Sequence, residues 1–170
     1  GIEVPPEFRS LDIWWNNLQK GILEIQRRLK GKIFEDKDIS FRKLDNETNL
    51  HYIMKAIVYK YLKLRGYEVE VEVPKDIGGK SRKIDLVAHK DRKEIYIEVE
   101  TGMPAKEEIE EHGGYINPEE RLMSEKKIGK YISSNTSTKD VILVVPNIFG
   151  IIHRKMLRGL RKYFKKHNVN

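Results

Sequence analysis

Apolar and polar residues alternate along the middle of the chain in a way that predicts strands. Residues 83–89 and 95–102 each alternate β-branched or apolar residues with other types, and the charged residues between them form a turn. Residues 67–73 alternate in the same way, with valines on one side and glutamates on the other, until Pro74 ends the strand. The continuous apolar run at 141–145 predicts a fourth strand, buried at the centre of the sheet.

Elsewhere, apolar residues recur at the spacing of a helix. Residues 10–31 form one such amphipathic helix, capped by Ser10. A second helix, capped by Asn46, ends near Gly66 and carries an inner stripe made of Leu50, Ile53, Met54, Ile57, Val58, Tyr61 and Leu62. A third begins with a cap and a first-turn proline, at Asn117-Pro118, and its inner residues are Leu122, Ile128, Tyr131 and Ile132.

The order helix, three strands, helix, strand predicts an α/β fold with a mixed sheet flanked by helices. We expect residues 1–44 to form an N-terminal helical extension and residues 45–170 to form the main domain. Residues 103–117 are acidic and contain two adjacent glycines, which is typical of a mobile loop, and residues 133–138 form a polar turn. A chain of 170 residues is long enough for one domain with its own core and such an extension.

Three carboxylates fall on one face of the two paired strands. Glu98 and Glu100 are two residues apart and share a face of their strand. Asp85 is on the neighbouring strand, between Ile84 and Leu86, and points away from the apolar face of that strand. Carboxylates this close repel one another, so the cluster implies a bound cation or raised pKa values, and a hard divalent ion is the simplest answer. Alternatively, Glu98 and Glu100 are the solvated face of an edge hairpin. Glu47, near the start of the second helix, is a further candidate acid, although an acid there also favours the helix dipole.

The charge of the chain favours a polyanionic partner. Lys and Arg number 33 against 26 Asp and Glu, which gives a formal net charge of +7. A helix expected over 153–166 has no acid and carries only basic charges, from Arg154, Lys155, Arg158, Arg161, Lys162, Lys165 and Lys166. Such a face is typical of phosphate binding, although a basic C-terminal tail can also serve solubility alone.

Several classes of protein are excluded by what the sequence lacks. There is no cysteine, which excludes disulfides and thiolate sites. No run approaches the roughly 18 apolar residues of a membrane span, and the first residues have no signal-peptide pattern, so we expect a cytoplasmic protein without a membrane partner. No Walker-type phosphate loop, His-Glu-x-x-His or Gly-x-Ser-x-Gly motif is present. Abundant Lys, Glu and Ile with only Gln19 and Gln26 for glutamine resembles the usage of thermophile proteins.

The element order and the acids resemble the PD-(D/E)XK superfamily of restriction-endonuclease-like nucleases, which includes archaeal Holliday-junction resolvases and mobile-element nucleases. The resemblance covers residues 45 to about 146 and rests on Asp85 and the run Glu98, Val99 and Glu100. It implies that Asp85 and Glu98 bind the metal ion and that the Val99 carbonyl is a further ligand. It also implies that Glu47 is the helix acid found in many members.

The chain departs from the family pattern at the usual lysine, which is replaced by Glu100. Resemblance to members with Glu at this position implies that Glu100 is the working group. Other members carry the lysine on the helix after the third strand, where this chain has Lys126 and Lys127. Lys127 with Tyr131 resembles the Gln-x-x-x-Tyr pairing of the RecB-like branch, with Lys in place of Gln. Lys83 is another candidate for this cation.

The resemblance implies a Mg²⁺-dependent endonuclease or exonuclease that hydrolyses phosphodiester bonds in DNA, with Mn²⁺ able to substitute. Glu100 or Lys127 would orient or deprotonate the attacking water. Two alternatives stay open. One is a catalytically inactive nucleic-acid-binding domain on the same fold, and the other is a protein-interaction module of a mobile-element protein. The preferred DNA structure and the oligomeric state, a homodimer included, stay open as well.

Overall fold

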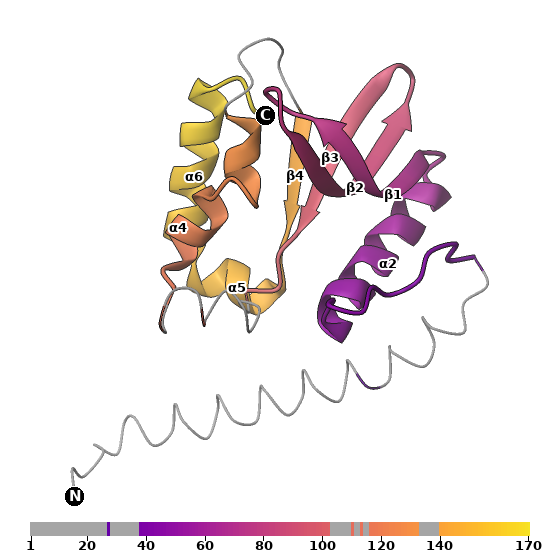
Figure 1. The fold of residues 1–170 in the computed structure, drawn as a ribbon, viewed down its shortest axis with the longest axis horizontal. Coiled ribbons are helices and arrows are strands. Elements are labelled where there is room, and N and C mark those ends of the chain that lie inside the picture. Colours follow the sequence, from indigo (N-terminus) through magenta and orange to yellow (C-terminus); the bar gives the residue numbers. More distant parts are fainter. Residues whose placement is uncertain (1–26, 28–37, 103–109, 111–112, 114–115, 133–139) are drawn as a thin grey trace, which may run out of the picture. The chain divides into compact units, whose positions relative to one another are not determined.

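The computed structural model describes residues 27, 38–102, 110, 113, 116–132 and 140–170 (Figure 1). The chain divides into two compact units, Gly1–Ile53 and Met54–Asn170, and the boundary falls inside helix α2 (Asn49–Leu64). Nearly all of the predicted 10–31 helix lies outside the described residues, as do the predicted turn at 133–138 and most of the predicted loop at 103–117. The predicted domain boundary between residues 44 and 45 therefore stays a prediction.

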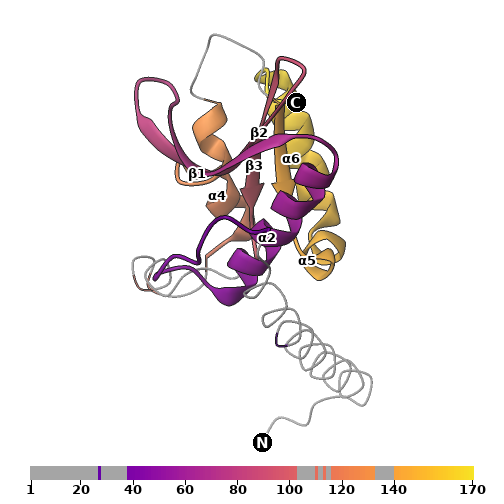
Figure 2. The same cartoon turned by 90° about the vertical axis from the view of Figure 1, so that its right-hand side faces the viewer.

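The second unit is built on a four-stranded sheet in the order β1-β2-β3-β4. The strands are β1 (Glu68–Asp76), β2 (Ser81–Lys90), β3 (Lys93–Val99) and β4 (Asp140–Val144); the first three are antiparallel neighbours, and β4 runs parallel to β3. The later helices are α4 (Pro118–Met123), η1 (Ile128–Tyr131), α5 (Asn147–Ile152) and α6 (Arg154–Lys166). Figures 1 and 2 show α4 and α6 on one side of the sheet and the C-terminal half of α2 on the other. The predicted α/β fold with a mixed sheet is confirmed. No helix in the described part of the chain is long and apolar enough to span a membrane.

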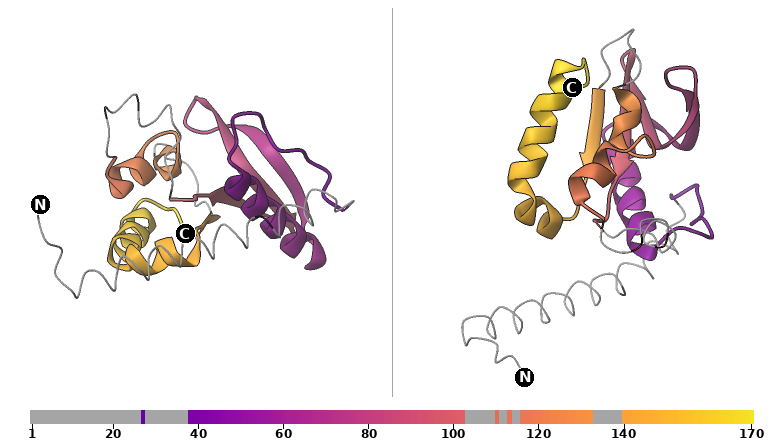
Figure 3. Two further views of the ribbon diagram at one scale, coloured as in Figure 1. Left: turned by 90° about the horizontal axis from the view of Figure 1, so that it is seen from below. Right: turned by 60° about the vertical axis from the view of Figure 1, so that its left-hand side comes forward.

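Strand β4 lies at the edge of the sheet, so the prediction that 141–145 is a central strand is wrong. Helix α6 runs alongside β4 (Figure 3), and Val141 and Leu143 pack against the core cluster on that side. The Val141 N–H donates a hydrogen bond to the Asn170 carbonyl at 2.9 Å, so the last residues cover part of the strand edge. A continuously apolar strand is compatible with an edge position where a helix and another segment cover it.

Helix α2 begins later than predicted. Asn49 is its first residue, and the Thr48 hydroxyl accepts a hydrogen bond from the His51 N–H at 3.2 Å. Thr48 therefore acts as the cap in place of Asn46, since a hydroxyl oxygen at this position satisfies one of the free N–H groups of the first turn. The predicted end is confirmed, because the helix stops at Leu64 and Gly66 follows with φ +78°.

The inner face of α2 is also rotated from the predicted stripe. Within the second unit the buried residues are Lys55, Ala56, Tyr59 and Leu62, whereas Ile57 and Tyr61 of the predicted stripe are exposed. Lys55 is fully buried because its ammonium group forms an ion pair with Glu72 of β1. A hydropathy pattern places lysine on the exposed face of a helix, so the sequence does not predict the ion pair between Lys55 and Glu72.

At one point of the β1–β2 pairing, the apolar side chains of both strands switch from one face of the sheet to the other. The ladder skips the facing pair Glu72 and Asp85, and Glu72 has φ +56°. On the hairpin side of this gap, Val73 and Ile84 pack in or against the core cluster, whereas Leu86 on the other side is fully buried outside it. The predicted regular alternation of valines therefore fails beyond Glu72, and β1 also continues past the predicted end at Pro74.

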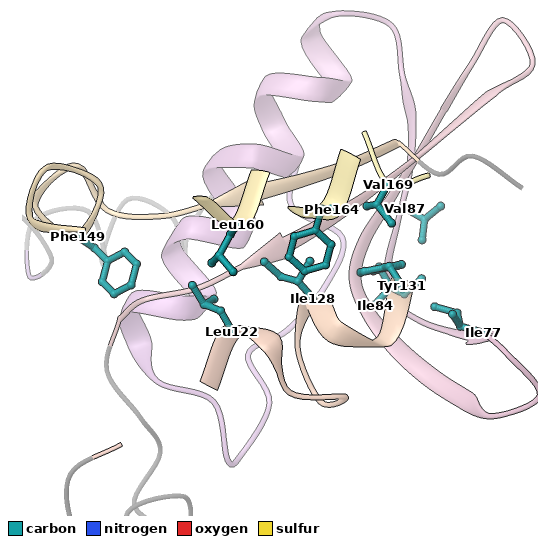
Figure 4. Packing of buried hydrophobic residues seen from close by; sticks show 10 residues of the cluster. All are labelled: Ile77, Ile84, Val87, Leu122, Ile128, Tyr131, Phe149, Leu160, Phe164 and Val169. Carbon is teal, nitrogen blue, oxygen red and sulfur yellow. The ribbon is translucent and has the colours of Figure 1, made fainter. Parts of the chain in front are cut away.

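The core cluster fills the space between the sheet and the helices α4, η1 and α6 (Figure 4). Its residues are Ile77, Ile84, Val87, Leu122, Ile128, Tyr131, Phe149, Leu160, Phe164 and Val169. The predicted inner residues Leu122, Ile128 and Tyr131 are buried as expected. They do not belong to one continuous helix, however, because α4 ends at Met123 and Ser124 has extended backbone angles. The chain turns there and re-enters a helical conformation in η1.

Gly129 allows η1 to pack directly against the end of α4. A Cβ atom at this position would clash with the backbone carbonyl of Met123, which cannot move aside as a flexible side chain can. The close approach holds Lys130 and Tyr131, the next two residues, over the sheet.

We expect Gly129→Ala to lower the free energy of unfolding by about 2 kcal/mol or more, because overpacking at a rigid backbone contact forces the two helices apart. The matched control is Gly159→Ala in α6, where no atom lies within 4 Å of the added methyl group. This control should raise stability by about 0.5–1 kcal/mol, since glycine is unfavourable inside a helix. Urea denaturation of both variants measures the difference, and equal effects would contradict the packing described for η1.

Candidate functional site

Asp85 lies where β2 loses its backbone pairing on both sides. The β1–β2 ladder skips Asp85. The pairing of β2 with β3 begins only one residue later, at Leu86, which lies opposite Ile97. Beyond this point the Asp85 carboxylate accepts a hydrogen bond from the Val99 N–H at 2.8 Å. A side-chain oxygen thus takes the place of a ladder acceptor, which fixes the carboxylate beside the end of β3.

Glu98 lies beside Asp85 and is buried, with 6% of its surface exposed. Its Oε1 atom is 2.7 Å from the Lys130 ammonium nitrogen and also accepts a hydrogen bond from the Tyr131 hydroxyl. Burial raises the pKa of the Glu98 carboxyl to about 7, and the negative charge of Asp85 adds to this effect, while Lys130 and Tyr131 act in the opposite direction. Asp85 and Glu98 therefore form one electrostatically coupled pair.

Lys130 and Tyr131 are the groups that hold Glu98 in place. Lys130 is buried and donates a second hydrogen bond, of 2.7 Å, to the carbonyl of Lys83. Tyr131 stacks on Tyr96 of β3 with ring centroids 5.6 Å apart. Burial and the Glu98 carboxylate raise the pKa of Tyr131 above its ordinary value, so the hydroxyl stays protonated and donates to Glu98. Lys130 was not predicted, because the groups that it contacts, Lys83 and Glu98, lie far from it in the sequence.

Glu100 lies on the same face of its strand but has its own cations. Its Oε1 atom pairs with the guanidinium of Arg121 and accepts the Gly102 N–H at 2.8 Å. Its Oε2 atom is buried and has no hydrogen-bond partner among the described residues, and the Lys127 ammonium lies 3.4 Å away. Lys127 is thus the predicted lysine nearest to this carboxylate. Arg121, on the short helix α4, was not predicted.

The three acids do not form a single cluster of metal ligands. Among residues 38–102, 116–132 and 140–170, no three His, Cys, Asp or Glu side chains lie close enough to share a metal ion. The physical reason is that Glu98 and Glu100 each turn toward protein cations. The other predicted lysines lie elsewhere: the Lys83 ammonium is 2.8 Å from Glu72, and Lys126 is exposed.

Glu47 belongs to the first unit, where its side chain has local partners. It accepts the Leu44 N–H at 3.1 Å, and its other oxygen lies 2.5 Å from the Nδ1 atom of His51. These contacts give Glu47 a role at the start of α2. Its role as the helix acid of a metal site stays a prediction.

The coupled pair of Asp85 and Glu98 fits a hard divalent ion better than any wider set of acids here. Mg²⁺ is commonly held by one or two carboxylates and completes its shell with water and phosphate oxygens. Burial is the main cause of the raised pKa of Glu98, and a cation bound beside it would favour the ionised carboxylate. An ion here would be held by Asp85 and Glu98, in addition to the Val99 N–H and the Lys130 ammonium that these carboxylates already contact.

Helix α6 displays its basic residues to solvent. Arg154, Lys155, Arg158, Arg161, Lys162, Lys165 and Lys166 are all exposed, while Leu160 and Phe164 anchor the helix in the core. The predicted one-signed face is thus available to a polyanion.

Comparisons with known proteins give no relative for this chain, because no family model, curated protein or solved structure matches it.

We expect the buried Glu98 carboxyl to make stability fall as the pH rises. Its pKa moves from 4.5 in a free side chain to about 7 in the fold, so folded Glu98 holds its proton more tightly. The stabilisation is complete below pH 4.5 and is lost as the pH rises through 7, a change of roughly 3 kcal/mol. The measurement is the free energy of unfolding against pH for the wild type and Glu98→Gln. The difference between the two curves should change between pH 4.5 and 7. Parallel curves would contradict a raised pKa of the Glu98 carboxyl.

Proposed function

We propose that the chain is a metal-dependent nuclease that hydrolyses phosphodiester bonds in DNA. The observation that carries this proposal is the coupled pair of Asp85 and Glu98 at the point where β2 and β3 stop pairing. Paired acids with a perturbed pKa are typical of functional sites, because a fold that needed only stability would not bury them together. The family resemblance of Asp85, Glu98 and Glu100 supports the same chemistry.

In this proposal Asp85 and Glu98 hold the metal ion. When bound, Mg²⁺ or Mn²⁺ would neutralise charge on the scissile phosphate and lower the pKa of an attacking water. Tyr131 and Lys130 both contact the Oε1 atom of Glu98 and so orient its carboxylate. The hydrogen bond from the Val99 N–H fixes Asp85 in the same way.

Glu100 and Lys127 are the two candidates for the role of the missing family lysine. The Oε2 atom of Glu100 is buried and has no hydrogen-bond partner among the described residues, so a water admitted with the substrate would find an acceptor there. Lys127, 3.4 Å from that atom, is able to place a positive charge beside a phosphate. Helix α6 would supply the wider attraction for the DNA backbone.

A second candidate function is a nucleic-acid-binding domain without catalysis. The observation in its favour is that the protein's own cations already pair with Glu98 and Glu100, through Lys130 and Arg121. Such pairing stabilises the acids without a metal ion. On this alternative α6 binds nucleic acid and the buried acids only maintain the fold.

Nicking of supercoiled plasmid in Mg²⁺ tests the nuclease proposal. Wild-type protein should nick the plasmid, and Asp85→Asn and Glu98→Gln should each lower the rate by at least about a hundredfold, because each removes a ligand of the ion. Glu94→Gln is the matched control, since Glu94 lies on the same strand face but pairs with Lys75. Calorimetric titration with Mn²⁺ should show binding to the wild type that both site variants lose. Binding of DNA without nicking or Mn²⁺ uptake would favour the second candidate.

The same assay separates the roles of Glu100 and Lys127. If Glu100 is the working group, Glu100→Gln abolishes nicking and Lys127→Ala has little effect. If the lysine has taken over, the order is reversed. Parent rates for both variants would exclude both roles and leave Arg121, paired with Glu100, and Lys130, paired with Glu98, as the remaining cations of the site.

The contribution of α6 is measured by the salt dependence of DNA binding. Each phosphate contact adds about −0.9 to the slope of log K against log salt concentration on duplex DNA. The triple variant Arg158→Ala, Arg161→Ala and Lys165→Ala should flatten this slope by about 1 to 3. Alanine at the exposed residues Arg42, Lys63 and Lys93 removes the same charge outside α6 and is the control. Equal slopes for the two triple variants would remove α6 from the interface.

A further inference from the structure

Two consecutive isoleucines project from the junction between α5 and α6. Ile151 is 72% exposed and Ile152 is 55% exposed. Phe149 of the same short helix is buried in the core cluster and anchors it. Single exposed apolar residues are common on protein surfaces. Ile151 and Ile152 are adjacent on an anchored helix and form a small apolar surface, the apolar tip, which favours contact with an apolar partner.

The apolar tip is followed directly by positive charge. Arg154, Lys155 and Arg158 follow within two turns, and all three are exposed. Ile151 and Arg154 also line a surface hollow of about 430 Å³ together with Val145, Pro146, Asn147 and Gly150. An apolar tip next to cations is complementary to a polyanion with an apolar interior, and duplex nucleic acid, with stacked bases between two rows of phosphates, has this chemistry.

The tip lies at the same edge of the sheet as the carboxylates. Strands β3 and β4 are parallel, so their C-terminal ends meet, and the Glu100 N–H donates to the Val144 carbonyl at 2.9 Å. Gly102, two residues further on, packs so closely on the Phe149 ring that a Cβ atom there would overlap it. Figure 1 shows α5 next to the segment that leaves β3. The α5–α6 junction therefore lies at the same end of the sheet as Glu100, and an extended partner such as DNA is able to cover both.

Ring packing and backbone hydrogen bonds hold the α5–α6 junction in place. The ring of His153 lies 4.4 Å from that of Phe149, and the His153 N–H donates to the Phe149 carbonyl at 2.9 Å. The Leu157 N–H donates to the His153 carbonyl at 2.9 Å, which links the tip to the first turn of α6. The isoleucines are thus presented by packed backbone.

We propose that Ile151 and Ile152 form an apolar wedge that enters an opened base step of duplex DNA, while Arg154, Lys155 and Arg158 bind the flanking phosphates. The inference rests on the proposed function and names its substrate class: duplex DNA whose stacking is already weakened by a bulge or a mismatch. Such sites cost less to unstack, so a wedge selects them without reading bases.

The test compares binding to a perfect duplex and to one with a single-base bulge, in EDTA so that cleavage does not interfere. The bulged duplex carries 2-aminopurine next to the bulge, and this base becomes brighter when it is unstacked. The wild type should bind the bulged duplex at least about tenfold more tightly, as expected for burial of one large aliphatic side chain, and should raise the fluorescence. Ile151→Ser with Ile152→Ser should lose the preference and the fluorescence rise while the salt slope stays unchanged. The matched control is Ile57→Ser with Leu64→Ser, which alters two exposed apolar residues of α2 and should keep both signals.

Two outcomes would overturn the wedge. One is equal preference for the bulged duplex in the Ile151→Ser, Ile152→Ser variant and the wild type. The other is binding to phosphatidylglycerol vesicles that this variant loses, without a 2-aminopurine signal, which would assign the tip to an anionic lipid surface. Plasmid nicking reports the nuclease proposal independently. If the wild type nicks plasmid but shows no preference for the bulged duplex, only the wedge is excluded. If every carboxylate variant nicks plasmid as the wild type does, only the nuclease proposal is excluded.

Discussion

The interruption of the backbone ladders at Asp85 is the constraint on which the site depends. Strand β2 skips its partner Glu72 on one side, and its pairing with β3 stops at the next residue on the other. Backbone groups released inside a fold need new partners. The Asp85 carboxylate takes the Val99 N–H, and the Lys130 ammonium takes the Lys83 carbonyl. Both substitutions draw charged groups into the interior, so the geometry of the strands itself creates a polar site.

The charges of this site are compensated in part. Lys130 neutralises Glu98, and Arg121 with Lys127 faces Glu100, yet burial and the neighbouring Asp85 still raise the pKa of Glu98. Buried ion pairs contribute little net stability, because the desolvation of each ion offsets the attraction between them. A set of acids and bases kept under such conditions is therefore better explained by function than by folding. A metal ion or a cationic group of a partner beside Glu98 would favour its ionised form and offset the effect of burial.

The sequence predicted those features that depend on hydropathy periodicity. The strands, the second helix and the inner positions of Leu122, Ile128 and Tyr131 follow from burial of apolar residues, and the structure confirms them. The position of β4 at the edge was not predictable, because an apolar run does not reveal which segments cover it. The rotation of α2 and the role of Lys130 were missed for one shared reason. Each depends on a buried lysine whose partner comes from a distant strand, and such a partner leaves no local pattern.

The parallel pairing of β3 and β4 joins the two parts of the proposed DNA surface. Only Val145 and Pro146 separate β4 from α5, so the direction of β4 fixes where α5 begins. The ring of Phe149 then occupies the space that Gly102 leaves open after β3. Glu100 is two residues before this contact, and the exposed isoleucines of α5 are two and three residues after it. The same contact therefore sets the spacing between the carboxylates and the apolar tip, and a side chain added at Gly102 would displace one relative to the other.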